Sequence, residues 1–464
     1  MKKLTNVTPS PEQFTIIKRV RPGSELIRGA AGSGKTTTAV LKLKLMLLWF
    51  LARRQRSESS EPVRALVLTF NKTLRGYIQE LVSSNLPDGK ITVSVDTFAH
   101  WANTALGGRS IDDGDELGKL VRAHAETIGL PPGFLLAECE YLTGRFPPDR
   151  LDEYLGCRRD GRGATPRVEK ATREAILDKL IRPYNEWKEK NGRFDWNDVA
   201  VLLAAKKYYK YDIVIVDESQ DFSANQLRAI MSQLEDEHAV TYIIDTAQRI
   251  YARGFTWAEA GILIRPESSH RLSVNYRNTA SIAKLASSLM KNVQLDDDGT
   301  APSLLDAMEG AATPIMLKGL FSNQVQWAID YIKRNVDLSK ESVAFLHPKG
   351  WFTHLEKSLA AAGLEFVEVT QRREWPETNA NIALCTLHSA KGLDFDHVFL
   401  LGISESGLPD GSHDVGDERF EMACRLLAMA IARARTQVVL GYKPGEESPI
   451  LARLDGSTYQ EIAV

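Results

Sequence analysis

The sequence predicts an α/β protein with two parallel sheets, each covered by helices. Short runs rich in β-branched and aliphatic residues alternate with longer helical stretches, which is typical of parallel strands joined by helical crossovers. These runs form two series, so two α/β units are the economical interpretation, and the length of 464 residues has room for both. The predicted strands lie at 25–28, 64–70, 211–217 and 240–245 in the first series and at 342–347, 382–386, 397–402 and 437–441 in the second.

A helical segment separates the strands of the first series. Between residues 102 and 210 strand signals are absent and charged helical sequence predominates. The predicted organisation is therefore a first α/β domain at 1–101 plus 211–270, a helical insertion at 102–210, and a second α/β domain at 271–464.

Composition and charge exclude several classes of protein. The fractions of 43% hydrophobic and 25% charged residues are those of an ordinary globular chain and argue against a fibrous or largely disordered one. Lys and Arg number 58 against 60 Asp and Glu, a net charge of −2, so a nucleic-acid site would have to be a local concentration of positive charge. Two basic clusters, 53–56 and 206–210, are interpreted as solvated helix faces, with phosphate contacts as the alternative.

Targeting and metal signals are sparse. The apolar run at 40–52 is too short to span a membrane and contains Lys42 and Lys44, which predicts a buried helix. The four cysteines lack C-x-x-C spacing and the start of the chain shows no secretory signal, so we expect a cytoplasmic protein. No H-E-x-x-H spacing occurs among the nine histidines, and no zinc is assigned.

Residues 29–36, Gly-Ala-Ala-Gly-Ser-Gly-Lys-Thr, match the phosphate-binding pattern G-x-x-x-x-G-K-[ST]. The pattern follows a predicted strand and precedes a helix, the context in which backbone N–H groups wrap a phosphate. Lys35 would reach the β and γ phosphates and Thr36 would ligate Mg²⁺; an incidental Gly-rich turn is the alternative. The predicted ATP-binding residues of this loop are Gly29, Gly32, Ser33, Gly34, Lys35, Thr36 and Thr37.

Two acids follow the strand that ends near residue 216. Asp217 at the carboxyl end of the strand would hold Mg²⁺ through water, and Glu218 would polarise the attacking water. Acidic strand ends are also common solvated caps, and the upstream phosphate loop is what favours the functional interpretation.

Seven blocks, in order along nearly the whole chain, resemble the motifs of superfamily 1 helicases of the UvrD/Rep type. They lie at 8–13, 66–72, 96–101, 245–251, 272–277, 386–395 and 425–435. The resemblance implies two RecA-like P-loop domains, a 1B-like helical insertion, and ATP hydrolysis in a cleft between the two domains. An arginine from the opposite wall of such a cleft stabilises the γ-phosphate in the transition state.

The resemblance also implies individual roles. In the nucleotide site, Gln13 would read the adenine, Tyr276 would stack on it, and Gly392 and Asp394 would face the nucleotide. The implied catalytic set is Lys35, Glu218, Gln248, Arg277 and Arg433, where Gln248 senses the γ-phosphate and the two arginines are fingers. The implied nucleic-acid contacts are Phe70, Asn71, Lys72, Thr97, Trp101, Tyr251, Trp257, Asn275 and His388.

For the aromatic residues in that set, core packing is the alternative to base stacking. The family's motif around Tyr251 usually continues with arginine and tryptophan, whereas Trp257 or Phe255 would have to supply the stacking ring here. The last motif departs from the family at Ala428 and Ala432.

An accessory domain is missing from the expected place. Typical members of the family insert a large domain, called 2B, where this chain has only residues 371–381, which are enough for a loop. We expect no fused nuclease, because 29 residues follow Arg435 in this sequence.

The sequence therefore predicts a compact ATP-dependent translocase or helicase on single-stranded DNA, with 3′ to 5′ direction by resemblance. RNA as substrate, a separately encoded nuclease partner and a second copy of the chain stay open. Two other functions remain as alternatives. One is an ATP-binding regulatory component of a nucleic-acid-processing complex with little turnover, and the other is a P-loop enzyme such as a nucleotide kinase.

Overall fold

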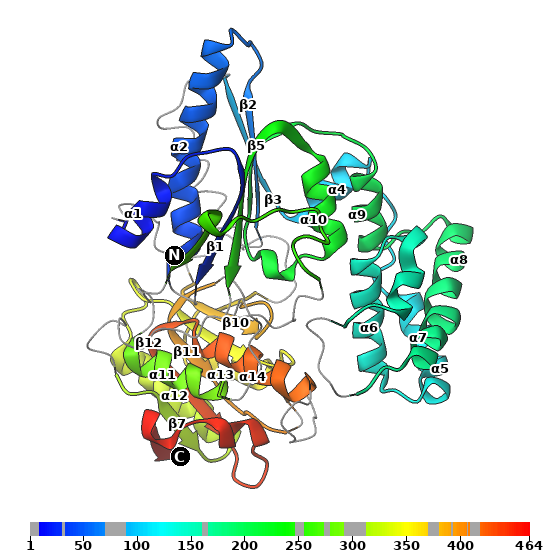
Figure 1. Cartoon of the computed structure of the whole chain (residues 1–464). Helices are drawn as coiled ribbons and strands as arrows, with labels where there is room; N and C mark the ends of the chain where they lie inside the picture. The colour runs from blue at the N-terminus through cyan, green and yellow to red at the C-terminus, as the bar shows by residue number, and fades with distance from the viewer. Residues whose placement is uncertain are drawn as a thin grey trace.

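The computed structural model describes residues 9–29, 33–69, 90–159, 166–245, 255–272, 279–291, 312–369, 380–390, 393–405, 407–408 and 418–464. These residues form two parallel sheets and a helical bundle (Figure 1). The predicted α/β class, with two parallel sheets, is confirmed.

The first sheet has six parallel strands in the order β3-β2-β4-β5-β1-β6. Strand β4 is buried along its whole length, as expected for a strand with helices on both faces. The strands are β1 Gly23–Gly29, β2 Val63–Leu68, β3 Ile91–Asp96, β4 Tyr211–Val216, β5 Leu234–Asp245 and β6 Ser269–Leu272.

Alternate residues of these strands enter two separate cores. Ala65 and Val67 of β2 pack with helices α1 (Pro11–Ile17) and α2 (Lys35–Arg56), whereas Leu66 and Leu68 face the opposite layer. That layer contains α4 (Phe98–Ala105), α9 (Trp196–Ala204) and α10 (Ala224–Ser232). The predicted helix at 40–52 is the middle of α2, and no helix in the described ranges is long and apolar enough to cross a membrane.

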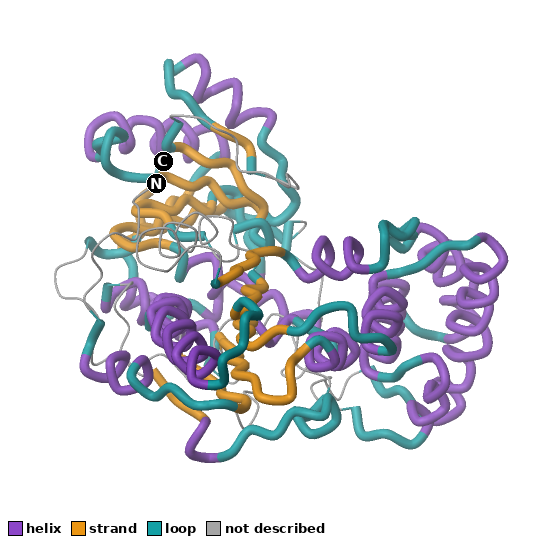
Figure 2. The backbone as a smooth tube through the Cα atoms, turned by 90° about the horizontal axis from the view of Figure 1, so that it is seen from above, coloured by secondary structure: helices purple, strands orange, loops and turns teal. Residues whose placement is uncertain are grey.

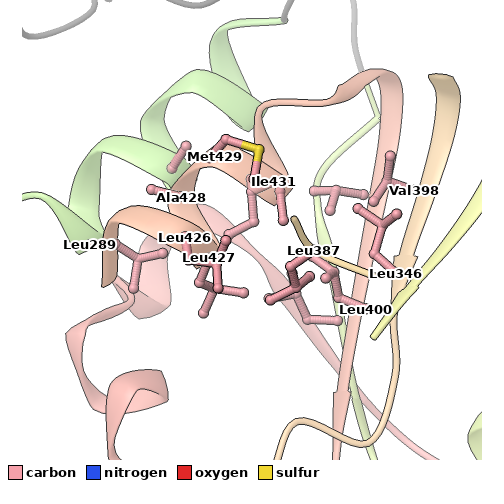
Figure 3. Packing of buried hydrophobic residues seen from close by; sticks show 14 of the residues in the cluster. Leu289, Leu346, Leu387, Val398, Leu400, Leu426, Leu427, Ala428, Met429 and Ile431 are labelled. Atoms are coloured by element: carbon pink, nitrogen blue, oxygen red, sulfur yellow. The ribbon is translucent and has the colours of Figure 1, made fainter. Parts of the chain in front are cut away.

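The second sheet has seven strands in the order β13-β7-β12-β11-β8-β10-β9, again parallel. Helices α11 (Ala280–Leu289) and α14 (Glu418–Ile431) cover one face, and α12 (Phe321–Asn335) and α13 (Thr353–Ala361) cover the other. Figure 3 shows Leu427 and Ile431 of α14 directed towards Leu387, Val398 and Leu400. The strands are β7 Ile315–Lys318, β8 Val343–His347, β9 Val367–Glu368, β10 Ile382–Thr386, β11 Phe395–Leu400, β12 Ala434–Tyr442 and β13 Gln460–Ala463.

The helical bundle lies to one side of both sheets (Figures 1 and 2). Its own core includes Leu135, Leu142, Ile176 and Leu180. The helices are α5 Asp115–Ile128, α6 Pro132–Arg145, α7 Lys170–Ile176 and α8 Arg182–Asn191, with a π-helical turn at Leu177–Ile181 between the last two. Helix α9 lies inside the expected insertion range of 102–210, but its buried residues belong to the first sheet's core.

The strands that were not predicted include β3, β6, β7 and β13. The clearest examples are β6, Ser-His-Arg-Leu, and β13, Gln-Glu-Ile-Ala, which are short and polar and so lack the apolar run by which strands are recognised. Strand β6 crosses the expected domain boundary at residue 270 and pairs with β1, so the first sheet extends to Leu272.

Candidate functional site

The structure describes only part of the predicted site. The predictions for Gly32, Phe70, Asn71, Lys72, Gln248, Tyr251, Asn275, Tyr276, Arg277 and Gly392 fall outside the described residues and stay predictions. The remaining residues of the predicted nucleotide site form one group around the start of α2 and a second group in the second sheet.

The phosphate loop joins β1 to α2 at the carboxyl edge of the first sheet. Gly34 has φ 77° and ψ 25°, a left-handed conformation that favours glycine, and a Cβ there would overlap the Gln13 amide. At Gly29 a Cβ would come within 2.7 Å of the Leu272 carbonyl oxygen. Helix α2 then begins at Lys35 without a side-chain cap, so its first N–H groups are oriented for an anion. Lys35, Thr36 and Thr37 make up its first turn.

Gln13 lies against this loop. Its Nε2 donates to the Ser33 carbonyl oxygen at 3.1 Å, and its Oε1 accepts from the Ser10 N–H at 3.0 Å. The latter bond belongs to a capping box that starts α1, in which Ser10 Oγ accepts from the Gln13 N–H. The predicted adenine reader is thereby fixed beside the predicted phosphate site.

Four side-chain oxygens meet where β4 ends. The Thr36 hydroxyl donates to Asp217 Oδ1 at 3.1 Å, and the Thr69 hydroxyl donates to Asp217 Oδ2 at 3.2 Å. Asp217 is buried at the carboxyl end of β4, where its backbone N–H donates to Leu68. Burial, followed by repulsion from Glu218, raises the pKa of Asp217 to about 7 against the opposing hydrogen bonds from Thr36 and Thr69.

Glu218 has a left-handed backbone with φ 52°, one of two such non-glycine residues in the described chain. A strained conformation of this kind costs about 1–3 kcal/mol and is concentrated at functional sites. Two contacts hold the turn: Ser219 Oγ donates to the Ile243 carbonyl of β5 at 2.9 Å, and Gln220 Nε2 donates to Glu218 Oε2 at 2.5 Å. The side chain of Glu218 is therefore fixed next to Asp217.

This group fits ATP and Mg²⁺. Hydroxyl and carboxylate oxygens are the ligands that Mg²⁺ prefers, and Thr36 and Asp217 already lie within hydrogen-bond distance of each other. Lys35 is close enough to Asp217 to oppose the rise of its pKa. Gly29 and Gly34 stand where a Cβ would collide with its surroundings.

The second sheet brings Asp394 and Arg433 together. Arg433 Nη1 lies 3.8 Å from Asp394 Oδ1 and donates to the Leu393 carbonyl oxygen at 3.3 Å. Only 2% of Arg433 is exposed, so its guanidinium is directed into its own domain in this conformation. Arg435, to which the sequence assigned no role, lies 3.5 Å from the other Asp394 oxygen and is more exposed.

Trp101 is a correction. The sequence placed it among the nucleic-acid contacts, but only 4% of its surface is exposed and its Nε1 donates to the Tyr211 hydroxyl at 3.2 Å. Tyr209 stacks on it at 6.0 Å, and Phe98 packs on its edge. The ring is part of the first sheet's core and presents no open face to a base.

The other predicted strand contacts differ in exposure. Thr97 caps α4 by accepting from the His100 N–H at 3.3 Å, and His388 is exposed in the turn after β10. Trp257 is half-buried with its ring 4.8 Å from Tyr242, whereas Phe255 is buried in the core. Of the two aromatic residues considered after Tyr251, only Trp257 keeps exposed surface.

The two basic clusters have different surroundings. Arg53 and Arg54 pair with Glu237 and Asp212, at 2.5 and 2.6 Å. Lys207 and Lys210 line, together with Arg64 and Tyr208, a surface pocket of about 470 Å³ beside the amino ends of β2 and β4. This pocket lies at the opposite sheet edge from the phosphate loop.

A contact that the sequence did not signal joins the bundle to the segment containing Trp257. Arg145, at the end of α6, places Nη2 2.6 Å from Glu259 Oε1. Arg228 of α10 donates to the Arg145 carbonyl at 2.9 Å and to the Glu259 carbonyl at 2.8 Å. Burial acts to raise the pKa of Glu259, but hydrogen bonds from Thr256 and Arg145 hold it below the ordinary value. Residues this far apart in sequence carry no local pattern that would pair them.

Comparison with known proteins agrees with these motifs. Residues 365–444 match the model of the UvrD-like helicase C-terminal domain. A "Probable DNA helicase" of Mycoplasma pneumoniae is 24% identical over 55% of this chain and 50% of its own length, and "DNA helicase II" of Haemophilus influenzae is 24% identical over 58% and 38%. A protein of Lactobacillus acidophilus, named as one subunit of an ATP-dependent helicase/nuclease, is 27% identical over 26% of this chain and 12% of its own length.

A solved C-terminal domain of a possible DNA helicase from Lactobacillus plantarum is 22% identical, with 40% of this chain and 99% of that chain covered and a TM-score of 0.30. The chain spans half or less of the length of the curated relatives named above. The predicted resemblance to UvrD/Rep-type superfamily 1 helicases is confirmed by the family model and the relatives.

Proposed function

We propose that this chain is an ATP-dependent motor on single-stranded DNA, a translocase or helicase that hydrolyses ATP between its two α/β units. The observation that supports this most strongly is the group formed by Thr36, Asp217 and Glu218 at the phosphate loop. In this proposal the group serves, beside the phosphate loop, as a magnesium site and a general base for phosphoryl transfer.

Each residue of that group has a distinct task in the proposal. Lys35 binds the β and γ phosphates, and Thr36 and Asp217 hold Mg²⁺, which when bound neutralises charge on the phosphates. Glu218 orients a water for attack on the γ-phosphate, and its strained turn keeps the carboxylate at one position. Gln13 reads the base from its place beside Ser33.

The second α/β unit completes the proposed cleft. Strands β1 and β5 point towards the second sheet, so the phosphate loop faces that unit (Figure 1). Arg277, Tyr276 and Gln248 are proposed to reach the nucleotide, and Arg433 to join them when its side chain turns from Asp394 towards the γ-phosphate. Loss of that phosphate on hydrolysis would release the grip between the units and drive stepping along the strand, 3′ to 5′ by resemblance.

Two points about the proposed motor have alternatives: whether a partner assists unwinding, and whether the chain turns over ATP rapidly. A separately encoded nuclease, or a second copy of the chain, is proposed to assist unwinding, and the relative named as one subunit of a helicase/nuclease supports an assembly with a partner. The competing function is an ATP-binding regulatory component of a nucleic-acid-processing complex, with little turnover. A nucleotide kinase is disfavoured by the helicase-like blocks, and RNA remains an alternative strand.

The deciding measurement is ATP turnover with and without a single-stranded oligonucleotide. We expect stimulation of about tenfold or more for the wild type, and a loss of about 10²–10⁴ in turnover for Glu218→Gln with ATP binding retained, since that change removes only the base. Glu237→Gln is the control, because Glu237 is exposed and paired with Arg53 far from the loop. If neither DNA nor RNA stimulates turnover, the motor is excluded and the regulatory role is favoured.

Direction needs a second assay. Strand displacement on duplexes with a 3′ or a 5′ single-stranded tail should favour the 3′ tail. Robust unwinding by the isolated monomer would contradict the requirement for a partner.

A further inference from the structure

Trp351 is unusually exposed for a tryptophan. It lies in the loop between β8 and α13, and 57% of its surface is accessible, whereas the next residue, Phe352, is buried in the second sheet's core. An indole this exposed contributes little to core packing.

The loop holds this ring in place. The backbone N–H groups of Lys349 and Trp351 both donate to His347 Nδ1, at 3.1 and 3.2 Å. The imidazole ring lies 5.4 Å from the indole, and Lys349 Nζ lies 5.1 Å from the indole centroid. Because His347 is buried at the end of β8, the turn is fixed to the sheet, and little conformational freedom of the backbone is left to lose on binding.

The loop adjoins the turn that was predicted to face DNA. Leu387 donates its backbone N–H to the His347 carbonyl at 3.3 Å, so the residues after β8 and those after β10 are neighbours at one sheet edge. His388, the next residue, is exposed. An aromatic ring, a lysine and a histidine are thus gathered at the carboxyl edge of the second sheet.

We propose that Trp351 is a stacking platform for an unpaired base of the DNA strand, with Lys349 contacting a neighbouring phosphate. This inference rests on the proposed function, since it names where the second α/β unit holds the same strand. Stacking on an aromatic face beside a cationic side chain suits single-stranded DNA, because every base has a π-face and every nucleotide a phosphate. A protein partner is disfavoured because the neighbouring Phe352 is buried, which leaves a single ring in place of a continuous apolar patch.

The test compares Trp351→Ala with a matched exposed aromatic. Tyr208 also carries a lysine over its ring, Lys206 at 5.2 Å, and is 39% exposed, but it lies beside the amino ends of the first sheet's strands. Affinity for a fluorescent oligo-dT is measured by anisotropy, together with the DNA concentration that gives half-maximal ATPase stimulation. We expect Trp351→Ala to weaken both by roughly tenfold, Trp351→Phe to retain most of the affinity, and Tyr208→Ala to match the wild type.

Turnover separates this inference from the proposed function. ATPase activity without DNA and at saturating DNA should be unchanged in Trp351→Ala, because the proposal gives the ring a role in strand binding and none in the nucleotide site. If the wild type binds and is stimulated but Trp351→Ala equals it, the platform is refuted while the motor stands. If Tyr208→Ala loses as much affinity for DNA as Trp351→Ala, removal of any exposed aromatic ring has the same effect. The platform is then again refuted. A wild type that neither binds nor responds to DNA refutes both.

Discussion

At the residue scale, His347 shows how a buried titratable group can hold a surface loop. Its Nδ1 accepts two backbone N–H bonds and must therefore be unprotonated, and burial, reinforced by Lys349, lowers the pKa of His347 to about 4. The ordinary value is 6.5. Between pH 6.5 and pH 4 the unfolded chain binds a proton that the folded chain does not, so the free energy of unfolding falls as the pH falls through that window.

The corresponding prediction uses His347→Asn. The Asn side chain can place an acceptor oxygen near the Nδ1 position but does not titrate, so the variant should lack this pH dependence. Urea unfolding at about pH 7.5 and about pH 5 should show the wild type losing about 2 kcal/mol more than the variant on acidification. Equal losses in the two proteins would contradict the assignment of His347 as the titrating group.

The sequence motifs predicted the phosphate loop but not the surroundings of every residue that they include. The pattern at 29–36 predicted the phosphate loop, and the structure places Thr36 and Asp217 3.1 Å apart as that interpretation requires. The same reasoning could not determine that the Trp101 ring is buried against Tyr211, because a motif gives a position in the chain and packing decides which way a side chain points. Trp351 lay in no quoted motif, and only its exposure reveals it.

At the element scale, the bundle is attached to the first sheet by polar contacts between α6, α10 and the segment that follows residue 254. Arg145 forms an ion pair with Glu259, and Arg228 donates to the backbone carbonyls of both residues. Asn225 donates to the Thr143 carbonyl at 2.8 Å. Because Arg145 is buried, removal of its side chain leaves polar groups in the interface without their donor.

A double-mutant cycle on Arg145→Ala and Glu259→Ala measures that attachment. We expect a coupling energy of about 1 kcal/mol in unfolding free energy, reduced from a fully buried pair because Glu259 is partly exposed. A cycle on the exposed pair Arg150 and Glu153, in the same bundle, should give a smaller coupling. Equal coupling in the two cycles would show that the Arg145 contact has no special role in joining the bundle.

Strand prediction was accurate where burial was complete. The fully buried runs β4 and β8 follow apolar patterns that predicted them, as do β10, β11 and β12. Strand β3 was missed although it shows the alternation of apolar and polar residues typical of a half-exposed strand, whereas β6 is short and polar and pairs with β1 at the sheet edge. Their place in the sheet depends on tertiary pairing, which no local pattern encodes.

At the scale of the whole molecule, nucleotide binding should couple to stability. A ligand that binds only the folded state at about 100 times its dissociation constant stabilises it by about 2.7 kcal/mol, which raises the unfolding midpoint by several degrees for a domain of this size. A non-hydrolysable ATP analogue with Mg²⁺ should raise the thermal midpoint of the wild type.

The matched protein is Lys35→Ala, which removes the cation of the phosphate loop without touching either core. It should show little or no shift at the same analogue concentration. A shift equal to that of the wild type would place the nucleotide elsewhere.

Strand β6 also affects how force passes between the two α/β units. It pairs in parallel with β1, with Leu272 opposite Gly29, and the next described helix along the chain, α11, packs on the second sheet. A pull on that connection acts as shear along the β1–β6 hydrogen bonds and arrives at the residue where the phosphate loop begins. Tension between the two halves of the molecule is therefore transmitted through this strand to the loop at which ATP is proposed to bind.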